Sequence, residues 1–574
     1  MSKENNTKDV KQQTDKGQHE KRQRRKSQSE VQNEVQNEVQ DILPIKNCNY
    51  KLELFNVCVI VPILVLIAAC GLFLILYSTS KYGSAITHDS VAYIYAAETF
   101  LSGKGMQYFG YESPFIQWPP LFPLILAGVK STGANLINTL PYLNGIFYAL
   151  IILISGLWIL RSTSNGILAI ISSLAMLASI PLYYVSRFIW CEPLFIFLTL
   201  LFLMSIDIHV EKSNESSSIK YLILSSVFTA LSCLTRYVGV TSIITGVIIL
   251  LLQKKKLLKR LLEIICFGTI SSVPTIMWII RNYLLTGTLT GGRIPSHNGL
   301  NENLEFYFKT IAHWIVPAHS LNMAYLIIGN FIFIAVILIF IYRLRLTSKS
   351  NINTYQSKIT TSTNINKMII LLIFYVIYSA YLLISASKVS FDSINNRLLS
   401  PIYPPLILIM LFTISSYIDF VKRGIINTVF SLIVIMLLFF SWIMYPLSDI
   451  KDNASYSYEN GAGVLTSEWW KQSSLIKYVK TLPSNSIICS NCPDAIYIHS
   501  GRLSRYSPKK EGLYWYGVNQ FEKIVDENEN VFIVWFNVDE VESVYNVQEL
   551  QEHFRLEMIN KLYDGIIYKV HKKL

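Results

Sequence analysis

Long apolar segments recur along this chain. The first, FNVCVIVPILVLIAACGLFLILY (55–77), runs for 23 residues without a charged side chain. About 20 such residues in an α-helix cross the ~30 Å hydrocarbon core of a bilayer, where only helices and closed barrels satisfy their own backbone polar groups. Charged residues make up only 15% of the chain, compared with about a quarter in soluble proteins. We therefore predict an all-α polytopic membrane protein and exclude a soluble globular one.

The apolar segments predict eleven transmembrane helices. A shorter apolar segment, PPLFPLILAGVK (119–130), lies in the long loop after the first span (78–137), and we expect it to form a helix in the membrane interface. The predicted spans cover residues 55–77, 138–160, 165–184, 188–206, 220–235, 237–252, 263–281, 322–341, 368–386, 402–419 and 425–445.

Basic residues orient these spans. If the N-terminus is inside, the predicted inner loops hold 15 Lys and Arg residues, including the cluster KKKLLKR (254–260), whereas the longer outer segments hold 10. Short loops rich in Lys and Arg stay on the cytoplasmic side. We therefore expect a multi-pass protein of the plasma (inner) membrane with a cytoplasmic N-terminus. The loop 78–137 then lies on the outer face.

The N-terminal segment differs from the predicted membrane domain (52–445). Residues 1–51 combine 11 Lys and Arg, 8 Asp and Glu and the repeat EVQNEVQNEVQ. Such a segment does not bury enough apolar surface to offset its ordering entropy, so we predict a disordered cytoplasmic tail. The basic run KRQRRK (21–26) suits lipid headgroups or a nucleic acid, but it is more simply a solvated run that holds the N-terminus inside. We expect no nucleic-acid partner.

The C-terminal segment (446–574) lacks a span and mixes two periodicities. SSLIKYVKTLP has helical spacing, whereas SIICSN, NVFIVWFNV and GIIYKVHKKL have the pattern of strands. We predict a small extracytoplasmic α/β domain. Its CSNC motif (489–492) is weak evidence for zinc without a second ligand pair, and a local disulfide or two unlinked thiols are the readings left open.

Ionisable side chains stand where predicted spans begin or end on the outer side, and such groups usually mark a path or a site. Arg236 lies in a tight turn, and Arg397 precedes SPIYPP, whose prolines fix the backbone. Fixed arginines suit bidentate binding of a phosphate. Glu192 either belongs to the site or only pairs with an arginine inside the bundle. The full set is Asp89, Arg187, Glu192, Arg236, Arg281, Arg293 and Arg397, of which Arg187 and Arg293 are read as headgroup anchors.

Asp89 opens a stretch with helical spacing. SVAYIYAAETFL (90–101) predicts a helix lying at the membrane interface, ended by the glycines of SGKG. One explanation of Asp89 is an N-cap for this helix, and the other is a chemical role. Glu98, nine residues on, points to the opposite side of the helix, so Asp89 would act as a single carboxylate. Tyr93, one turn beyond Asp89, is a candidate substrate contact.

Six motifs follow one another in a specific order: HDSVAYIYAAETFLSGKGM, WPPLFPLILAG, CEPLFIFLTLLFL, LTRYVG, RNYLLTG and RLLSPIYPP. In this order the chain resembles the C-type (GT-C) glycosyltransferases, which use lipid-linked sugars. The resemblance covers residues 55–445 and is greatest to the protein O-mannosyltransferase, aminoarabinose transferase and Rgt-like branches. That family often has two acidic residues after the first span. Here the second position is Ser90, so only Asp89 matches the catalytic position, and a metal-dependent variant is not indicated.

The resemblance implies a membrane glycosyltransferase. It implies transfer of a sugar from a polyprenyl-phosphate carrier to an acceptor hydroxyl on the outer face, with inversion and with Asp89 as general base. The acceptor is a lipid, a polysaccharide or a protein. The departing lipid phosphate needs positive charge, for which Arg397 is the first candidate, followed by Arg236 and Arg281. No motif requires a cofactor, although a divalent metal is compatible with the sequence.

A multi-pass transporter or lipid flippase is the alternative function. Such proteins tend to place ionisable groups near the bilayer midplane and to consist of repeated halves. In this sequence the charges gather at the predicted outer ends of the spans, and the spans show no internal repeat. The sequence therefore favours the glycosyltransferase.

Overall fold

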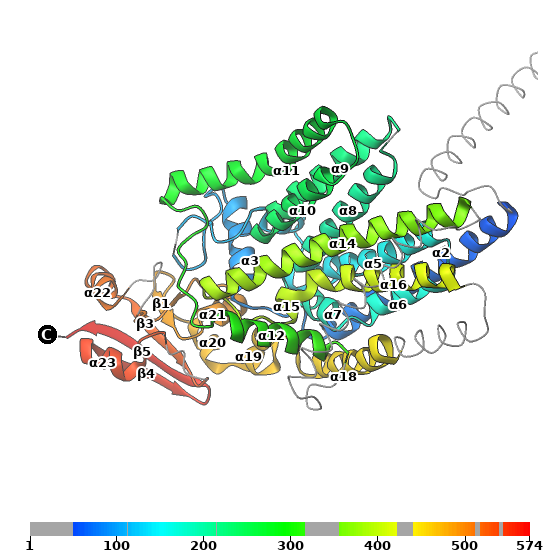
Figure 1. Ribbon diagram of the computed structural model, residues 1–574. Helices are drawn as coiled ribbons and strands as arrows, with labels where there is room; N and C mark the ends of the chain where they lie inside the picture. Colours follow the sequence, from blue (N-terminus) through cyan, green and yellow to red (C-terminus); the bar gives the residue numbers. More distant parts are fainter. Residues whose placement is uncertain are drawn as a thin grey trace, which may run out of the picture.

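A bundle of long helices carries a small α/β domain at one of its ends, as the computed structural model shows (Figure 1). The predicted tail lies outside the described residues apart from its last two positions, and so do the predicted span 322–341 and most of the predicted span 425–445. The described residues are 50–111, 113–213, 215–315, 355–421, 440–510, 517–538 and 543–573.

Within the described residues, seven segments are long and apolar enough to cross a membrane. They follow predicted spans, but the predicted total of eleven is not confirmed. The segments lie in α2 (Tyr50–Thr79), α5 (Leu136–Thr163), α8 (Glu192–Glu211), α9 (Ser218–Thr235), α11 (Leu257–Thr286) and α14 (Tyr355–Lys388), and the last, Asn396–Ser416, contains α15 (Asn396–Leu399) and most of α16 (Tyr403–Val421).

The predicted span 165–184 is a broken one. It consists of α6 (Gly166–Leu177) and α7 (Ile180–Ser186), whose axes meet at an angle of 52°. The break occurs at Ser179, whose hydroxyl oxygen accepts the backbone N–H of Leu182 at 3.3 Å and so caps the new helix.

The predicted span 237–252 corresponds to an apolar helix shorter than the seven above. A 3-10 turn (Tyr237–Gly239) leads into α10 (Val240–Leu251), which has 12 residues. Arg236 in front of the turn has extended backbone angles, and the polar run QKKK follows the helix. These two features set the ends of α10.

Three further helices lie among the segments that connect the spans, namely α3 (His88–Leu101), α4 (Leu121–Ser131) and α12 (Leu300–His313). The first two match the helices predicted at 90–101 and 119–130. However, α3 is not a surface helix, because nine of its 14 residues are buried. Its tyrosines pack against aromatic rings of the following loop, including Phe109 and Trp118, so burying aromatic area outweighs exposing the helix to the membrane surface.

The C-terminal domain contains a five-stranded mixed sheet with the strand order β2-β1-β3-β5-β4. The central pair β1 and β3 is parallel, as is the pair β1 and β2, whereas β5 runs antiparallel to β3 and β4. Three strands lie within the segments predicted from alternation and β-branched residues. The strands are β1 (Ile487–Ser490), β2 (Arg505–Tyr506), β3 (Val531–Phe536), β4 (Phe554–Leu562) and β5 (Gly565–Lys572).

Helices α20, α22 and α23 pack against this sheet, whereas α18 packs on the bundle. The helix predicted at SSLIKYVKTLP is present as α20, and Cys489 and Cys492 of the CSNC motif are not joined by a disulfide. The helices are α18 (Tyr445–Asn460), α19 (Glu468–Gln472), α20 (Ser474–Val479), α21 (Pro493–Ser500), α22 (Val518–Glu527) and α23 (Val547–His553).

The domain packs on the end of the bundle where the first span finishes. A Cβ on Gly463 would lie 2.6 Å from the Cβ of Ala85, so the backbone after α18 lies directly against the segment that leads into α3. Ala85 in turn pairs with Phe188 in a short parallel bridge. The fold thus gathers α3, the start of α8 and the C-terminal domain at one end of the molecule.

Candidate active site

Asp89 is the second residue of α3, and it is not the cap of that helix. Thr87 is the N-cap residue, and its backbone N–H donates to the Oγ of Ser90 at 3.1 Å. The sequence-based explanation of Asp89 as an N-cap is therefore wrong, because the cap falls two residues earlier. The carboxylate of Asp89 instead leaves the helix sideways, with 22% of its side chain exposed.

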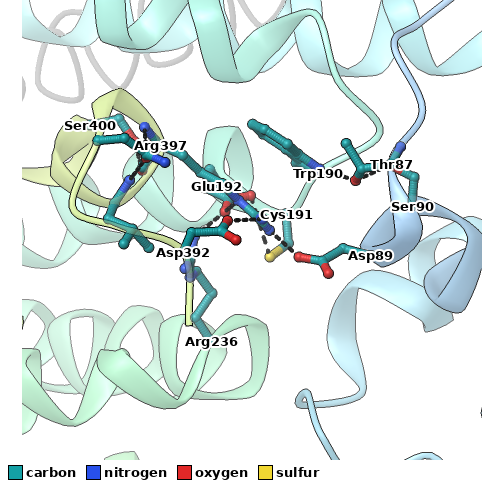
Figure 2. Close-up of polar contacts among 12 residues, drawn as sticks. Thr87, Asp89, Ser90, Trp190, Cys191, Glu192, Arg236, Asp392, Arg397 and Ser400 are labelled. Atoms are coloured by element: carbon teal, nitrogen blue, oxygen red, sulfur yellow. Dashed lines mark hydrogen bonds and ion pairs between the residues drawn. The ribbon is translucent and has the colours of Figure 1, made fainter. Parts of the chain in front are cut away.

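Arg397 lies opposite this carboxylate. Its Nη2 is 2.5 Å from Oδ2 of Asp89, and its Nε is 2.6 Å from Oε1 of Glu192 (Figure 2). The arginine is held in place from behind, since the side chain of Asn395 accepts the N–H of Arg397 at 2.9 Å and thereby caps α15. One planar guanidinium thus connects residues that are 308 and 205 positions away in the sequence.

Glu192 is the hub of the site. It is the first residue of α8 and is fully buried. Besides Arg397, the Nη1 of Arg236 donates to the same carboxylate oxygen, Oε1. A buried carboxylate is tolerated only when it is paired, and two arginines meet that need. Glu192 thus pairs with two arginines, and one of them, Arg397, also contacts Asp89.

The backbone conformation of Arg236 directs its side chain toward Glu192. It ends α9 with extended angles (φ −147°, ψ 139°) before the short turn into α10. Its side chain is 17% exposed, and that of Arg397 is 10% exposed. The structure therefore brings together four of the six residues predicted for the site, Asp89, Glu192, Arg236 and Arg397, from four separate segments.

The remaining two predicted residues, Tyr93 and Arg281, make other contacts. Tyr93 borders the cluster, because the Sγ of Cys191, which its hydroxyl contacts, lies 3.8 Å from the Oε2 of Glu192. Tyr93 is buried, with its hydroxyl 3.5 Å from the Sγ of Cys191 and its ring among Phe115, Trp118 and Phe122. Burial raises the pKa of the Tyr93 phenol well above its usual range, so the group is neutral.

Arg281 is directed toward the loop after α3. Its Nη1 donates to the carbonyl of Phe115 and to the Oδ1 of Asn282, both at 3.0 Å, and its guanidinium lies 4.5 Å from the ring centre of Trp278. It therefore holds that loop against α11.

The two arginines read as headgroup anchors behave differently. Arg187 is buried, its Nη1 donates to the Oγ of Ser457 at 2.5 Å, and its guanidinium stacks on Tyr183. The anchor reading is wrong for Arg187, because the chain after the bundle folds back over it. Arg293 is exposed and donates to the carbonyl of Thr290 at 3.0 Å.

Two residues of the site are missing from the sequence-based set. The ring of Trp190 lies 4.1 Å from the guanidinium carbon of Arg397, and its Nε1 donates to the Oγ1 of Thr87 at 2.8 Å. Asp392 accepts from Arg397 at 3.4 Å and is mostly exposed. The only sequence signal for Trp190 is its place in RFIWCEP, two residues before Glu192. Nothing in the sequence distinguishes Asp392 from other charged loop residues.

The cluster contains two arginines and three carboxylates. Within the described residues, no group of three or more His, Cys, Asp and Glu side chains is arranged to hold a metal ion. The carboxylates of Asp89 and Glu192 are matched by two arginines, with Asp392 at the edge. A partly exposed carboxylate beside a fixed guanidinium is able to accept a proton from a hydroxyl and to bind an anionic oxygen.

No model of a known protein family matches the sequence, and no curated protein matches it either. Solved structures do match. ArnT from Cupriavidus metallidurans in the apo state superposes with a TM-score of 0.57 at 12% identity, covering 88% of this chain and 97% of that one. The chain has the ArnT fold. ArnT bound to undecaprenyl phosphate matches over the same shares, with a TM-score of 0.55 at 13% identity. The resemblance to the C-type glycosyltransferases is thereby confirmed for the fold.

Proposed function

We propose that this protein is an integral-membrane glycosyltransferase that moves a sugar from a polyprenyl-phosphate carrier to an acceptor hydroxyl. The ArnT-like fold over most of the chain supports this proposal, as does the binding of undecaprenyl phosphate by ArnT. The observation that carries it is the contact of Asp89 with Arg397, a carboxylate beside a guanidinium of the kind that suits phosphate.

The residues divide the chemistry between them. Asp89 accepts the proton of the acceptor hydroxyl as the new bond from its oxygen to the anomeric carbon forms. The bond from that carbon to the phosphate oxygen breaks, and polyprenyl phosphate leaves with the electron pair. Attack opposite the leaving group inverts the anomeric centre. Arg397, supported by Arg236 through Glu192, stabilises the charge on the departing phosphate.

The ion pair between Asp89 and Arg397 gives the site a resting state. A lipid phosphate that binds Arg397 takes over the donor that Asp89 holds in the empty site. The carboxylate is then released to act as a base only when the donor is present. The acceptor class, whether lipid, polysaccharide or protein, is left open, and so is the sugar. The proposed location is the inner membrane, with the site on the outer face.

The test is a transfer assay on protein in nanodiscs with a panel of radiolabelled polyprenyl-phosphate sugars. We expect release or transfer of one sugar by the wild type, and a loss of about 10²- to 10⁴-fold in Asp89→Asn, which keeps the shape of the side chain but not its basicity. Asp526→Asn, a change of an exposed carboxylate in the C-terminal domain, serves as the control. Equal turnover by Asp89→Asn and wild type would remove Asp89 from the mechanism. Transbilayer movement of intact donor without bond cleavage would instead identify a flippase.

A further inference from the structure

The C-terminal domain touches the helix that presents Asp89. His88, the residue directly before Asp89, lies with its Nδ1 3.1 and 3.0 Å from the two carboxylate oxygens of Asp494. Its Nε2 is 2.6 Å from the hydroxyl of Tyr108. Asp494 belongs to the first turn of α21 and stands 406 residues away in the sequence. The contact therefore joins the two parts of the molecule next to the proposed base.

Asp494 is fixed within its own domain. Its side chain is 8% exposed, and the hydroxyl of Tyr506 on β2 donates to its Oδ2 at 2.8 Å. Pro493 opens α21 and sets the backbone at this point. Asp494 is thus a rigid acceptor, so the position of the imidazole follows from the position of the C-terminal domain.

A second contact holds the far end of the same helix. The hydroxyl of Tyr497, one turn beyond Asp494 on α21, donates to the carboxylate of Glu98 near the C-terminus of α3. Lys130 of α4 pairs with the same glutamate. Because α3 has 14 residues and a rise of ~1.5 Å per residue, the C-terminal domain fixes both ends of a segment about 20 Å long.

Successive residues of a helix point about 100° apart, so His88 and Asp89 face different neighbours. His88 meets the C-terminal domain, whereas Asp89 meets Arg397 from the bundle. We propose that Asp494 is a positioning residue for Asp89, acting through His88 to hold the first turn of α3 at the correct distance from Arg397. The proposal rests on the proposed function, since it assigns the C-terminal domain a part in that reaction.

The charge of His88 makes this contact sensitive to pH. Partial burial lowers the pKa of His88, but the Asp494 carboxylate outweighs it, with a further contribution from Asp89, so the pKa lies above its usual value although Lys509 opposes the proton. Tyr108 and Tyr506 also face the ring, and both phenols have raised pKa values and stay neutral. The charged contact is therefore present at low pH and is lost as the pH rises through the folded-state pKa of His88.

The experiment compares Asp494→Asn and His88→Asn with wild type, with Asp526→Asn as the matched control. Asp526 is also a paired aspartate of the C-terminal domain, with Lys572 3.0 Å away. We expect both site variants to lower kcat about 10- to 100-fold, the size of a misplacement of ~1 Å, with the donor KM within about twofold. The alkaline limb of the pH profile of kcat should move to lower pH in Asp494→Asn, because His88 loses its charged partner. Asp494→Glu should recover part of kcat.

Three outcomes of the kinetic comparison would overturn the proposal. They are unchanged kcat and pH profile in both variants, an equal loss in Asp526→Asn, and a loss that follows melting temperature alone without a shift of the alkaline limb. Amide hydrogen exchange of residues 88–101 provides a readout without turnover, and we expect faster exchange in Asp494→Asn than in Asp526→Asn. If the wild type transfers no sugar, the proposed function fails, and unchanged exchange in Asp494→Asn would separately refute the positioning role.

Discussion

At the scale of single residues, the site depends on the shape of a guanidinium. Arg397 contacts Asp89 through Nη2 and Glu192 through Nε, while its face lies on Trp190. A lysine has one ammonium and no planar face, so it serves at most one of these partners well. The charge alone is therefore not sufficient for this position.

Arg397→Lys consequently tests the geometry separately from the charge. We expect sugar transfer to fall about 10²- to 10³-fold, the cost of losing one stabilising donor at a developing negative charge, and we expect the protein to remain folded. Arg293→Lys, at an exposed arginine outside the cluster, should keep wild-type turnover. The check is kcat in the nanodisc assay together with the melting temperature. Wild-type kcat in Arg397→Lys would show that the fork geometry is unimportant.

At the scale of secondary-structure elements, the N-terminus of α3 decides where Asp89 lies. Thr87 caps the helix, and its hydroxyl is 3.2 Å from that of Ser90 while it also accepts from Trp190. The same indole supports Arg397. One threonine therefore links the start of the helix that carries Asp89 to the indole on which Arg397 lies.

Thr87→Ala should remove this link. We expect a stability loss of about 1 kcal/mol, the usual effect of losing an N-cap side chain, together with faster amide exchange in the first turn of α3. Thr87→Ser keeps the hydroxyl and should behave like wild type. Thermal unfolding and exchange mass spectrometry measure the two effects. If Thr87→Ser lost as much stability as Thr87→Ala, the effect would come from the lost methyl group and not from the cap.

At the scale of the whole molecule, the C-terminal domain is seated directly on the segment before α3. Gly463 has extended backbone angles (φ −165°), so any residue fits its conformation, but a Cβ there would lie 3.2 Å from the Cα of Ala85 and 2.6 Å from its Cβ. The absence of a side chain, and not the backbone angle, permits this close approach.

Gly463→Val should push the two parts of the molecule apart. We expect a loss of about 1–3 kcal/mol, as for other overpacked sites, and a fall in sugar transfer because the contact at His88 is displaced. Gly128→Val is the control, because a Cβ at Gly128 on α4 meets nothing within 4 Å. Limited proteolysis after α18 reports the loosening. If Gly463→Val resisted the protease as well as the wild type, close packing of Gly463 against Ala85 would be contradicted.

The sequence by itself determined the class of this protein. Apolar length forces helices in a membrane, and charge bias predicts their direction, because both depend on transfer from water to lipid residue by residue. The same reasoning located α3, α4 and three strands, since alternation and turn residues are local signals. It also identified Asp89, Glu192, Arg236 and Arg397 as candidate site residues, because ionisable side chains at the ends of spans usually mark a path or a site.

Only the tertiary structure decided which of these charges meet. Arg281 has the same kind of sequence context as Arg397 but contacts the loop after α3 instead of the cluster. Arg187 is covered by Ser457, and Trp190 and Asp494 have no local signal of their role. Pairing of charges that are hundreds of residues apart depends on the packing of helices and on the desolvation of each partner. The sequence therefore identifies the candidate charged residues. Only the three-dimensional arrangement, in which two arginines share one buried carboxylate, shows which of them form the cluster.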